Sequence, residues 1–287
     1  MTLGESITRW VEDAVQRLRQ DPTNARRTSQ IVARFLAEAG IDSVDDLRAP
    51  GLMEWLRREA AAKAPRTVRN ELAAVRQWSR YLAATGEVER APFESVKVAR
   101  CDSDDGCDAI TDEQAERLLA NAREECRSER WQVAANAPAR LAAYVLMLDC
   151  GLRIGEVRAQ RWSDVDLERR TMRISRDKAR RKDVIALPRR AVAVLRWLRR
   201  VQVAEGIELV RVVPAGPNAK KMRADLDRVG CSGEAGRFHR LRKNAITKRA
   251  MQGWDVWRLT KWARHRDPKT TLRYVRPQVE EMRRIAE

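Results

Sequence analysis

The stretch KVARCDSDDGCDAIT, residues 97–111, interrupts a chain whose apolar residues otherwise recur mostly at helical spacing. It is rich in Asp, with Ser and Gly, and shows no periodicity, which is typical of a linker. A chain of 287 residues is long for one compact core and sufficient for two. We therefore expect one domain over residues 1–96, a linker over 97–110 and a second domain over 111–287.

The first domain is expected to be a small helical bundle. Ser6 is a candidate N-cap for a first helix, and Gly40 a candidate glycine after the end of the second. The fourth predicted helix, APRTVRNELAAVRQWSRYLAATG, places Val68, Leu72 and Leu82 on one face. Four such segments with short connections predict an all-helical unit.

The second domain begins with a helical pattern whose Thr111 and Gln114 have the spacing of a capping box. A long apolar helix follows from residue 139. It is expected to break at Gly151, and a second helix to end near Asp164.

Two short β-like runs, 171–175 and 183–187, surround a basic tip and predict a hairpin with a long loop. Another helix follows over 189–206, whereas the pattern of 205–235, with several Gly and Pro residues, predicts no clear element. The fold class expected is mainly α with a small antiparallel β-sheet.

The net charge of +17 is unevenly distributed along the chain. Residues 169–200 contain 13 basic and 2 acidic residues, and residues 237–273 contain 12 basic and 2 acidic residues. Basic surface at this density favours a polyanionic partner, most often nucleic acid. A membrane surface fits less well, because the basic runs do not form one amphipathic helix.

Other site classes are disfavoured by composition. The five cysteines are scattered without a C-x-x-C pair, and two histidines are too few for a histidine-built metal cluster. No apolar run approaches the roughly 20 residues that span a bilayer. The first thirty residues have no secretory pattern, so we expect an intracellular, cytoplasmic protein.

Several basic and aromatic residues stand out by their local context. Arg153 follows the Gly151 break at a helix start, and Glu156, three residues on, lies on the same face and can orient it. His239 and Arg242 also share a helix face. Taken one at a time, such arginines and histidines are common on protein surfaces. Of the three tyrosines, Tyr81 and Tyr144 lie in apolar helical patterns that indicate core, whereas Tyr274 follows a Thr-Thr pair near the second histidine, His265.

Taken in order, six residues resemble the tyrosine recombinase (phage integrase) family of site-specific DNA recombinases: Arg153, Lys178, His239, Arg242, His265 and Tyr274. The segments around them, CGLRIGEVRAQRWSDVD, RDKARRKDVIALP and HRLRKNAITKRA through RHRDPKTTLRYV, are similar to the blocks of that family. The resemblance covers about residues 110–287. It extends more loosely to the N-terminal bundle, which is similar to the SAM-like core-binding domain of the family.

One position departs from the family pattern, and the lysine position has more than one candidate residue. The family usually has Leu-Gly-His before the tyrosine segment, where this chain has Ala263-Arg264-His265. The lysine position is assigned to Lys178 if VIALP sets the register. Neighbouring basic residues remain alternatives: Lys182, Arg176, Arg180 and Arg181.

The resemblance implies metal-independent cleavage of DNA through a 3′-phosphotyrosyl intermediate, with no cofactor. Tyr274 would be the nucleophile, Arg153 and Arg242 would clamp the phosphate, and Lys178 would protonate the leaving oxygen. His239 would take or hold the tyrosine proton, and the remaining histidine, His265, would hydrogen-bond a phosphate oxygen.

The partners implied are double-stranded DNA, a homotetramer on two DNA sites and, in some systems, accessory DNA-bending proteins. The segment after Tyr274 is expected to be a short helix, either docked on a neighbouring protomer or an ordinary terminus. Two other functions remain open. One is a topoisomerase of the tyrosine type IB class, which relaxes DNA without exchanging partners, and the other is a DNA-binding protein that has lost catalysis.

Overall fold

The structure is a computed structural model, and it describes residues 2–98, 109–129, 136–175, 182–214, 219–231, 237–272 and 274. The chain forms two compact units, residues 1–104 and residues 105–287. The expected class, mainly helical with a small antiparallel sheet, is confirmed. Most of the segment expected to be a linker lies outside the described residues. None of the helices in the described ranges is long and apolar enough to cross a membrane.

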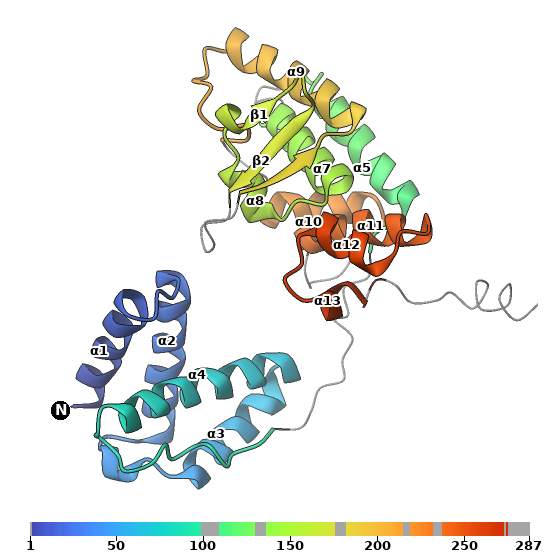
Figure 1. The fold of residues 1–287 in the computed structure, drawn as a ribbon. Helices are drawn as coiled ribbons and strands as arrows, with labels where there is room; N and C mark the ends of the chain where they lie inside the picture. The colour runs from blue at the N-terminus through green and yellow to red at the C-terminus, as the bar shows by residue number, and fades with distance from the viewer. Residues whose placement is uncertain are drawn as a thin grey trace, which may run out of the picture. The chain divides into compact units, whose positions relative to one another are not determined.

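The first unit is helical throughout its regular structure (Figure 1). Its elements are α1 (Leu3–Gln16), α2 (Pro22–Ala39), the short 3-10 helix η1 (Val44–Asp46), α3 (Ala49–Ala62) and α4 (Pro65–Ala84).

Large aromatic side chains fill the core of the first unit. Trp10, Trp55 and Trp78 are almost fully buried, and Phe35 meets Trp55 edge to face with ring centroids 5.3 Å apart. The expected N-cap at Ser6 is wrong. Thr2 caps α1 with a capping box, and Ser6 is buried inside the helix.

In the second unit three consecutive strands lie between two groups of helices. Its elements are α5 (Asp112–Glu125), α7 (Ala137–Cys150), α8 (Ile154–Ala159), η2 (Trp162–Asp164), β1 (Val165–Asp166), β2 (Thr171–Ser175), β3 (Lys182–Ala186), α9 (Arg189–Ala204), α10 (Ala219–Arg228), α11 (Arg237–Met251), α12 (Val256–Ala263) and α13 (Pro268–Leu272).

Helix α7 is the centre of this unit. Nearly all of its residues are buried, and it packs against α5, α9 and α11. This continuous burial explains why its sequence is apolar on all faces instead of on one stripe. The helix ends at Gly151 in a left-handed conformation, as the sequence predicts.

The sheet is antiparallel, with strand order β1-β2-β3. Thr171 pairs with Ala186 and Ser175 with Lys182, so the predicted hairpin is present, and its tip lies outside the described residues. Strand β1 was not expected. The second predicted helix ends at Ala159 and not near Asp164, because the chain turns there to place η2 and β1 beside β2.

The segment 205–235, which had no clear sequence pattern, contains α10 in its described part. Arg140, near the start of α7, is buried and forms an ion pair with Asp225 of α10 at 3.2 Å. The hydroxyl of Tyr144 donates to the same carboxylate at 2.6 Å. Buried polar groups are therefore paired where α10 packs on α7. Tyr144 is a core residue, as predicted, whereas Tyr81 is only half-buried.

Candidate active site

The turn between α7 and α8 is pressed against α12. A Cβ atom added to Gly151 would lie 2.6 Å from Cη2 of Trp262, and its φ of +60° also favours glycine. The turn then passes through Leu152 to Arg153, which occupies the N-cap position of α8. Glycine thus brings the first arginine close to the C-terminal helices.

Arg153 is held by the carboxylate that follows it by one helical turn. Its Nη1 atom donates to Oε1 of Glu156 at 2.9 Å, and its backbone N–H donates to Oε2 at 2.9 Å. The Arg153 side chain is 43% exposed whereas that of Glu156 is only 10% exposed. The glutamate therefore anchors a guanidinium that still faces solvent.

Arg242 comes from α11 and is 1% exposed. Its two terminal nitrogens donate to the carbonyl oxygens of Gly151 and Ala263, which fixes the guanidinium between the α7–α8 turn and the end of α12. Its Nε is buried and has no hydrogen-bond partner among the described residues. Burial, reinforced by the charges of Arg153 and Arg264, lowers the pKa of Arg242, yet the side chain stays protonated at neutral pH. Such a site favours an anion.

His239, one turn before Arg242 on α11, meets the tyrosine. Its Nε2 lies 3.2 Å from the Tyr274 hydroxyl. Partial burial and the charges of Arg242 and Arg153 lower the pKa of His239 below its usual value near 6.5. A neutral imidazole at this distance can accept a proton from the hydroxyl.

His265 follows α12 and lies against the same tyrosine, with ring centroids 5.9 Å apart and planes 20° from parallel. Burial and the charge of Arg242 lower the pKa of His265 to about 4, so the ring is neutral at pH 7. Its Nδ1 lies 2.8 Å from Oγ1 of Thr271, which in turn accepts from the hydroxyl of Thr260 at 2.8 Å. Because the Thr271 oxygen accepts from Thr260, its own hydroxyl proton is donated to Nδ1 of His265. The Nε2 atom of the neutral ring then carries the N–H and can act as a donor.

Five of the six residues singled out from the sequence therefore converge, from the α7–α8 turn, α11 and the α12–α13 region. The sixth, Lys178, lies outside the described residues, as do Arg176, Arg180 and Arg181. Lys182 is the first residue of β3, at the base of the hairpin.

Sequence reasoning missed two supports of the site. One is Thr271, whose only signal was its place in the Thr-Thr pair before Tyr274. The other is Arg264, visible in the sequence as a departure from the family pattern but without a contact to explain it. Arg264 acts through Glu156, 108 residues away along the chain, which local spacing does not reveal.

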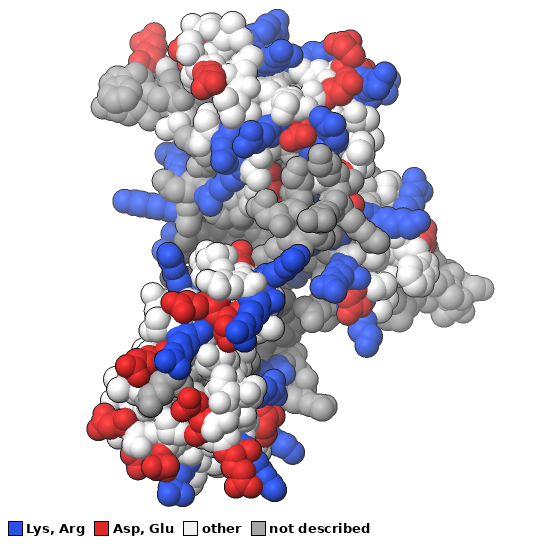
Figure 2. All heavy atoms as spheres, turned by 60° about the vertical axis from the view of Figure 1, so that its left-hand side comes forward, with Lys and Arg blue, Asp and Glu red and all other residues white. Residues whose placement is uncertain are grey.

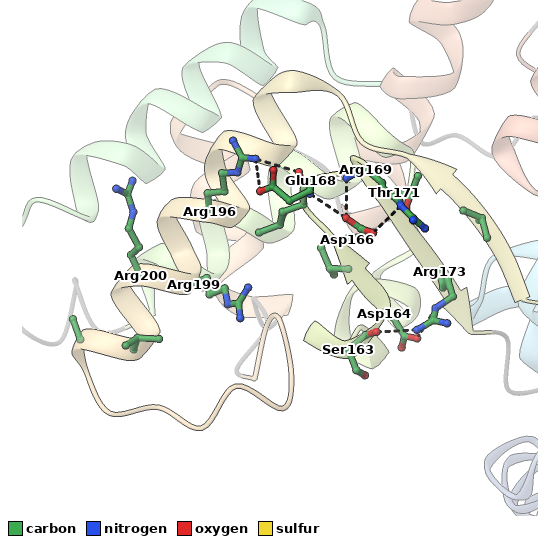
Figure 3. A pocket seen from close by; sticks show the side chains of 15 residues that line it. Ser163, Asp164, Asp166, Glu168, Arg169, Thr171, Arg173, Arg196, Arg199 and Arg200 are labelled. Carbon is green, nitrogen blue, oxygen red and sulfur yellow. Dashed lines mark hydrogen bonds and ion pairs between the residues drawn. The ribbon is translucent and has the colours of Figure 1, made fainter.

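A cavity of about 1170 Å³ lies elsewhere, between the β1–β2 region and α9 (Figure 3). Two of its arginines are paired with carboxylates: Arg196 lies 2.9 Å from Glu168, and Arg173 lies 3.4 Å from Asp164. We place the candidate active site at Tyr274 and not in this cavity, because among the described residues a tyrosine hydroxyl, an imidazole and two guanidiniums meet there.

Comparison with known proteins identifies the family of the chain. The family model described as the phage integrase family matches residues 108–281. The chain belongs to the phage integrase family, the tyrosine recombinases. A curated relative, the tyrosine recombinase XerC of Chlorobaculum tepidum, is 30% identical over 140 residues, which cover 46% of this chain and 41% of the relative. The matched region is thus less than half of that relative's length.

Solved structures share the fold at low sequence identity. XerH site-specific recombinase bound to its difH substrate has a TM-score of 0.71 at 13% identity, covering 99% of this chain and 84% of that one. The Tn1549 transposon integrase in complex with transposon right end DNA has a TM-score of 0.70 at 16% identity, with full coverage of both chains (100% each). A lambda integrase dimer bound to a core site has a TM-score of 0.71 at 16% identity, and the match covers 96% of this chain and 77% of that one.

Proposed function

We propose that this chain is a site-specific DNA recombinase that cuts and rejoins strands through Tyr274. The observation that carries the proposal is the 3.2 Å approach of the His239 Nε2 to the Tyr274 hydroxyl, beside the guanidiniums of Arg153 and Arg242. Membership of the phage integrase family supports the same reaction.

In the cleavage step, the Tyr274 oxygen attacks the scissile phosphorus while its proton passes to His239. A tyrosine–phosphorus bond forms, the bond from phosphorus to the 5′-oxygen breaks, and Lys178 supplies the proton to that oxygen. Negative charge accumulates on the non-bridging oxygens, where Arg153 and Arg242 can bind bidentately and His265 donates from Nε2. The products are a 3′-phosphotyrosyl enzyme and a free 5′-hydroxyl.

Rejoining reverses this step. The 5′-hydroxyl of a second strand attacks the phosphotyrosine, takes the 3′-phosphate and returns the proton to Tyr274 through His239. Because one ester replaces another, the energy of the phosphodiester is retained and no nucleotide cofactor is required. Exchange of partners at two sites distinguishes this function from that of a type IB topoisomerase.

Double-stranded DNA is the proposed partner, bound by four copies of the chain on two sites. The basic excess would mostly contact phosphate, and base readout is not assigned. On the face shown in Figure 2, Lys and Arg side chains occur in both units with Asp and Glu interspersed. Residues 1–96 would bind DNA as a core-binding domain and residues 111–287 would carry out catalysis, joined by the segment 97–110.

Several finer assignments belong to the same proposal. Action on DNA places the protein in the cytoplasm of its cell, and a mobile element is a suitable substrate for integration. Accessory DNA-bending proteins would take part at some sites.

The test is covalent trapping on nicked suicide DNA substrates taken from the flanks of the gene, in the presence of EDTA. We expect a protein–DNA band on a denaturing gel with the wild type and none with Tyr274→Phe, while both proteins shift the DNA equally. Tight binding of specific DNA with no covalent band would instead support a binding protein. Covalent cleavage followed only by relaxation, without exchange between two sites, would support a topoisomerase.

A further inference from the structure

Arg264 has a backbone conformation that its residue type rarely adopts. It ends α12 in the left-handed region with φ 56° and ψ 41°, where glycine carries no steric cost. Two other arginines in the described chain have positive φ, Arg19 and Arg170, and both are exposed. Arg264 differs from them because its side chain is only 3% exposed.

The buried guanidinium of Arg264 connects the α7–α8 turn to the end of α12. Its Nη2 donates to Oε2 of Glu156 at 3.0 Å and to the Gly151 carbonyl at 3.2 Å, and its Nη1 donates to the Trp262 carbonyl at 3.0 Å. A glycine at this position could adopt the same backbone conformation but could make none of these side-chain contacts. The planar fork of arginine suits several acceptors at once, which a lysine cannot match.

Glu156 is consequently shared between two guanidiniums. One oxygen accepts from the Arg153 side chain, and the other accepts from the Arg153 backbone N–H and from Arg264. Burial would raise the pKa of Glu156, but the charges of Arg264 and Arg153 and the backbone hydrogen bond outweigh it and hold the pKa below its usual value. The carboxylate is therefore ionised at neutral pH.

The charge balance of this trio determines what Arg153 can offer to a phosphate. A pair of Arg153 and Glu156 alone is formally neutral, whereas the trio with Arg264 carries one net positive charge. Arg264 is almost fully buried, and Arg153 is the exposed member of the trio. The excess charge is thus available on the side where an anion can approach.

We propose that Arg264 is a positioning residue for strand cleavage, which holds Glu156 and offsets its charge so that Arg153 presents an oriented, uncompensated guanidinium to the scissile phosphate. This inference rests on the proposed function. It also assigns a reason for arginine at a position where the backbone favours glycine.

The test compares cleavage rates at saturating DNA for wild type, Arg264→Gly and Arg264→Lys, each also made in an Arg153→Ala background. Loss of a direct oxyanion donor costs about 100-fold or more, so we expect about a tenfold loss for Arg264→Gly, which acts indirectly, and a smaller one for Arg264→Lys. In the Arg153→Ala background, Arg264→Gly should change the rate less than about twofold, because its effect passes through Arg153. DNA affinity should change little.

The matched control is Arg170→Gly, the same substitution at an exposed left-handed position of the same unit, and it should cleave like the wild type. A loss for Arg264→Gly of equal size in both backgrounds, with a lowered melting temperature, would show a purely structural role and overturn the inference. Unchanged cleavage by Arg264→Gly would also overturn it. A wild type that forms no covalent adduct would refute the proposed function first, and this inference with it.

Discussion

His239 and Tyr274, 35 residues apart in the chain, meet with the imidazole Nε2 3.2 Å from the phenolic oxygen. Helix α11 presents the histidine, and the short segment after α13 presents the tyrosine. The imidazole is the group through which the hydroxyl can lose its proton, because a tyrosine hydroxyl ordinarily has a pKa of about 10.

Replacing His239 with glutamine should therefore lower the cleavage rate by about 100-fold, the usual contribution of a positioned general base. The pH profile provides the sharper readout. Because the pKa of His239 is lowered from the ordinary histidine value near 6.5, the acid-side decline of the wild-type rate should lie at a lower pH than that of an unperturbed imidazole. The variant should instead gain rate as pH rises towards 9. Single-turnover cleavage between pH 5 and 9 measures both. Parallel profiles for the two proteins would exclude His239 as the base.

Thr271 is expected to be important although it touches no substrate atom in the proposed mechanism. It is fully buried between the Thr260 hydroxyl and the His265 ring. Thr271→Val keeps the shape and removes the hydroxyl, which leaves partners without a hydrogen bond and should cost about 1–3 kcal/mol of unfolding free energy.

The control for that substitution is Thr270→Val at the adjacent, exposed threonine, which should change the unfolding free energy by less than about 0.5 kcal/mol. Urea unfolding of both variants, and of Thr271→Ser as a conservative rescue, measures the difference. Equal effects at the two threonines would refute the role of Thr271 in orienting His265.

Local sequence patterns were sufficient for many of the helices, though not for α10, and for the hairpin, because periodicity, the Thr111 capping box and the glycine at 151 act within one or two turns. They failed at Ser6, where an equally good cap lies four residues earlier, and at β1, which exists only because β2 supplies its partner. The family resemblance identified residues that converge in the structure, but spacing could not show that Arg264 reaches Glu156, 108 residues away. Long-range contacts of buried polar groups are the part that one sequence does not reveal.

Gly151 should tolerate no side chain. Alanine there would combine a left-handed backbone with a Cβ 2.6 Å from Trp262, so Gly151→Ala should destabilise the second unit by about 2–4 kcal/mol. Gly155, in α8, has no neighbour within 4 Å of a built Cβ, so Gly155→Ala should be neutral or stabilise by up to about 1 kcal/mol. Urea unfolding, monitored by tryptophan fluorescence, compares the unfolding free energies of the two variants. A Gly151→Ala protein as stable as Gly155→Ala would contradict the close packing of the turn on α12.

The stability of the folded protein should fall as pH decreases from about 6.5 to about 4, because of His265. Its folded-state pKa is about 4, lowered by burial and by the charges of Arg242 and Arg153, whereas an unfolded histidine has its ordinary value near 6.5. Between these values the unfolded chain binds a proton that the folded chain does not, so protonation favours unfolding. Allowing for partial exposure of the ring, the loss should be about 1–2 kcal/mol.

Unfolding free energies of wild type and His265→Gln, measured by urea between pH 4 and 8, isolate this contribution from that of the carboxylates. The difference between the two proteins should be constant above pH 6.5 and should shift in favour of the variant as pH falls. A bound phosphate would oppose the effect, since its negative charge offsets that of the arginines and favours the protonated ring. Specific DNA should therefore flatten the wild-type curve, and a curve unchanged by both DNA and substitution would show that His265 does not titrate in this range.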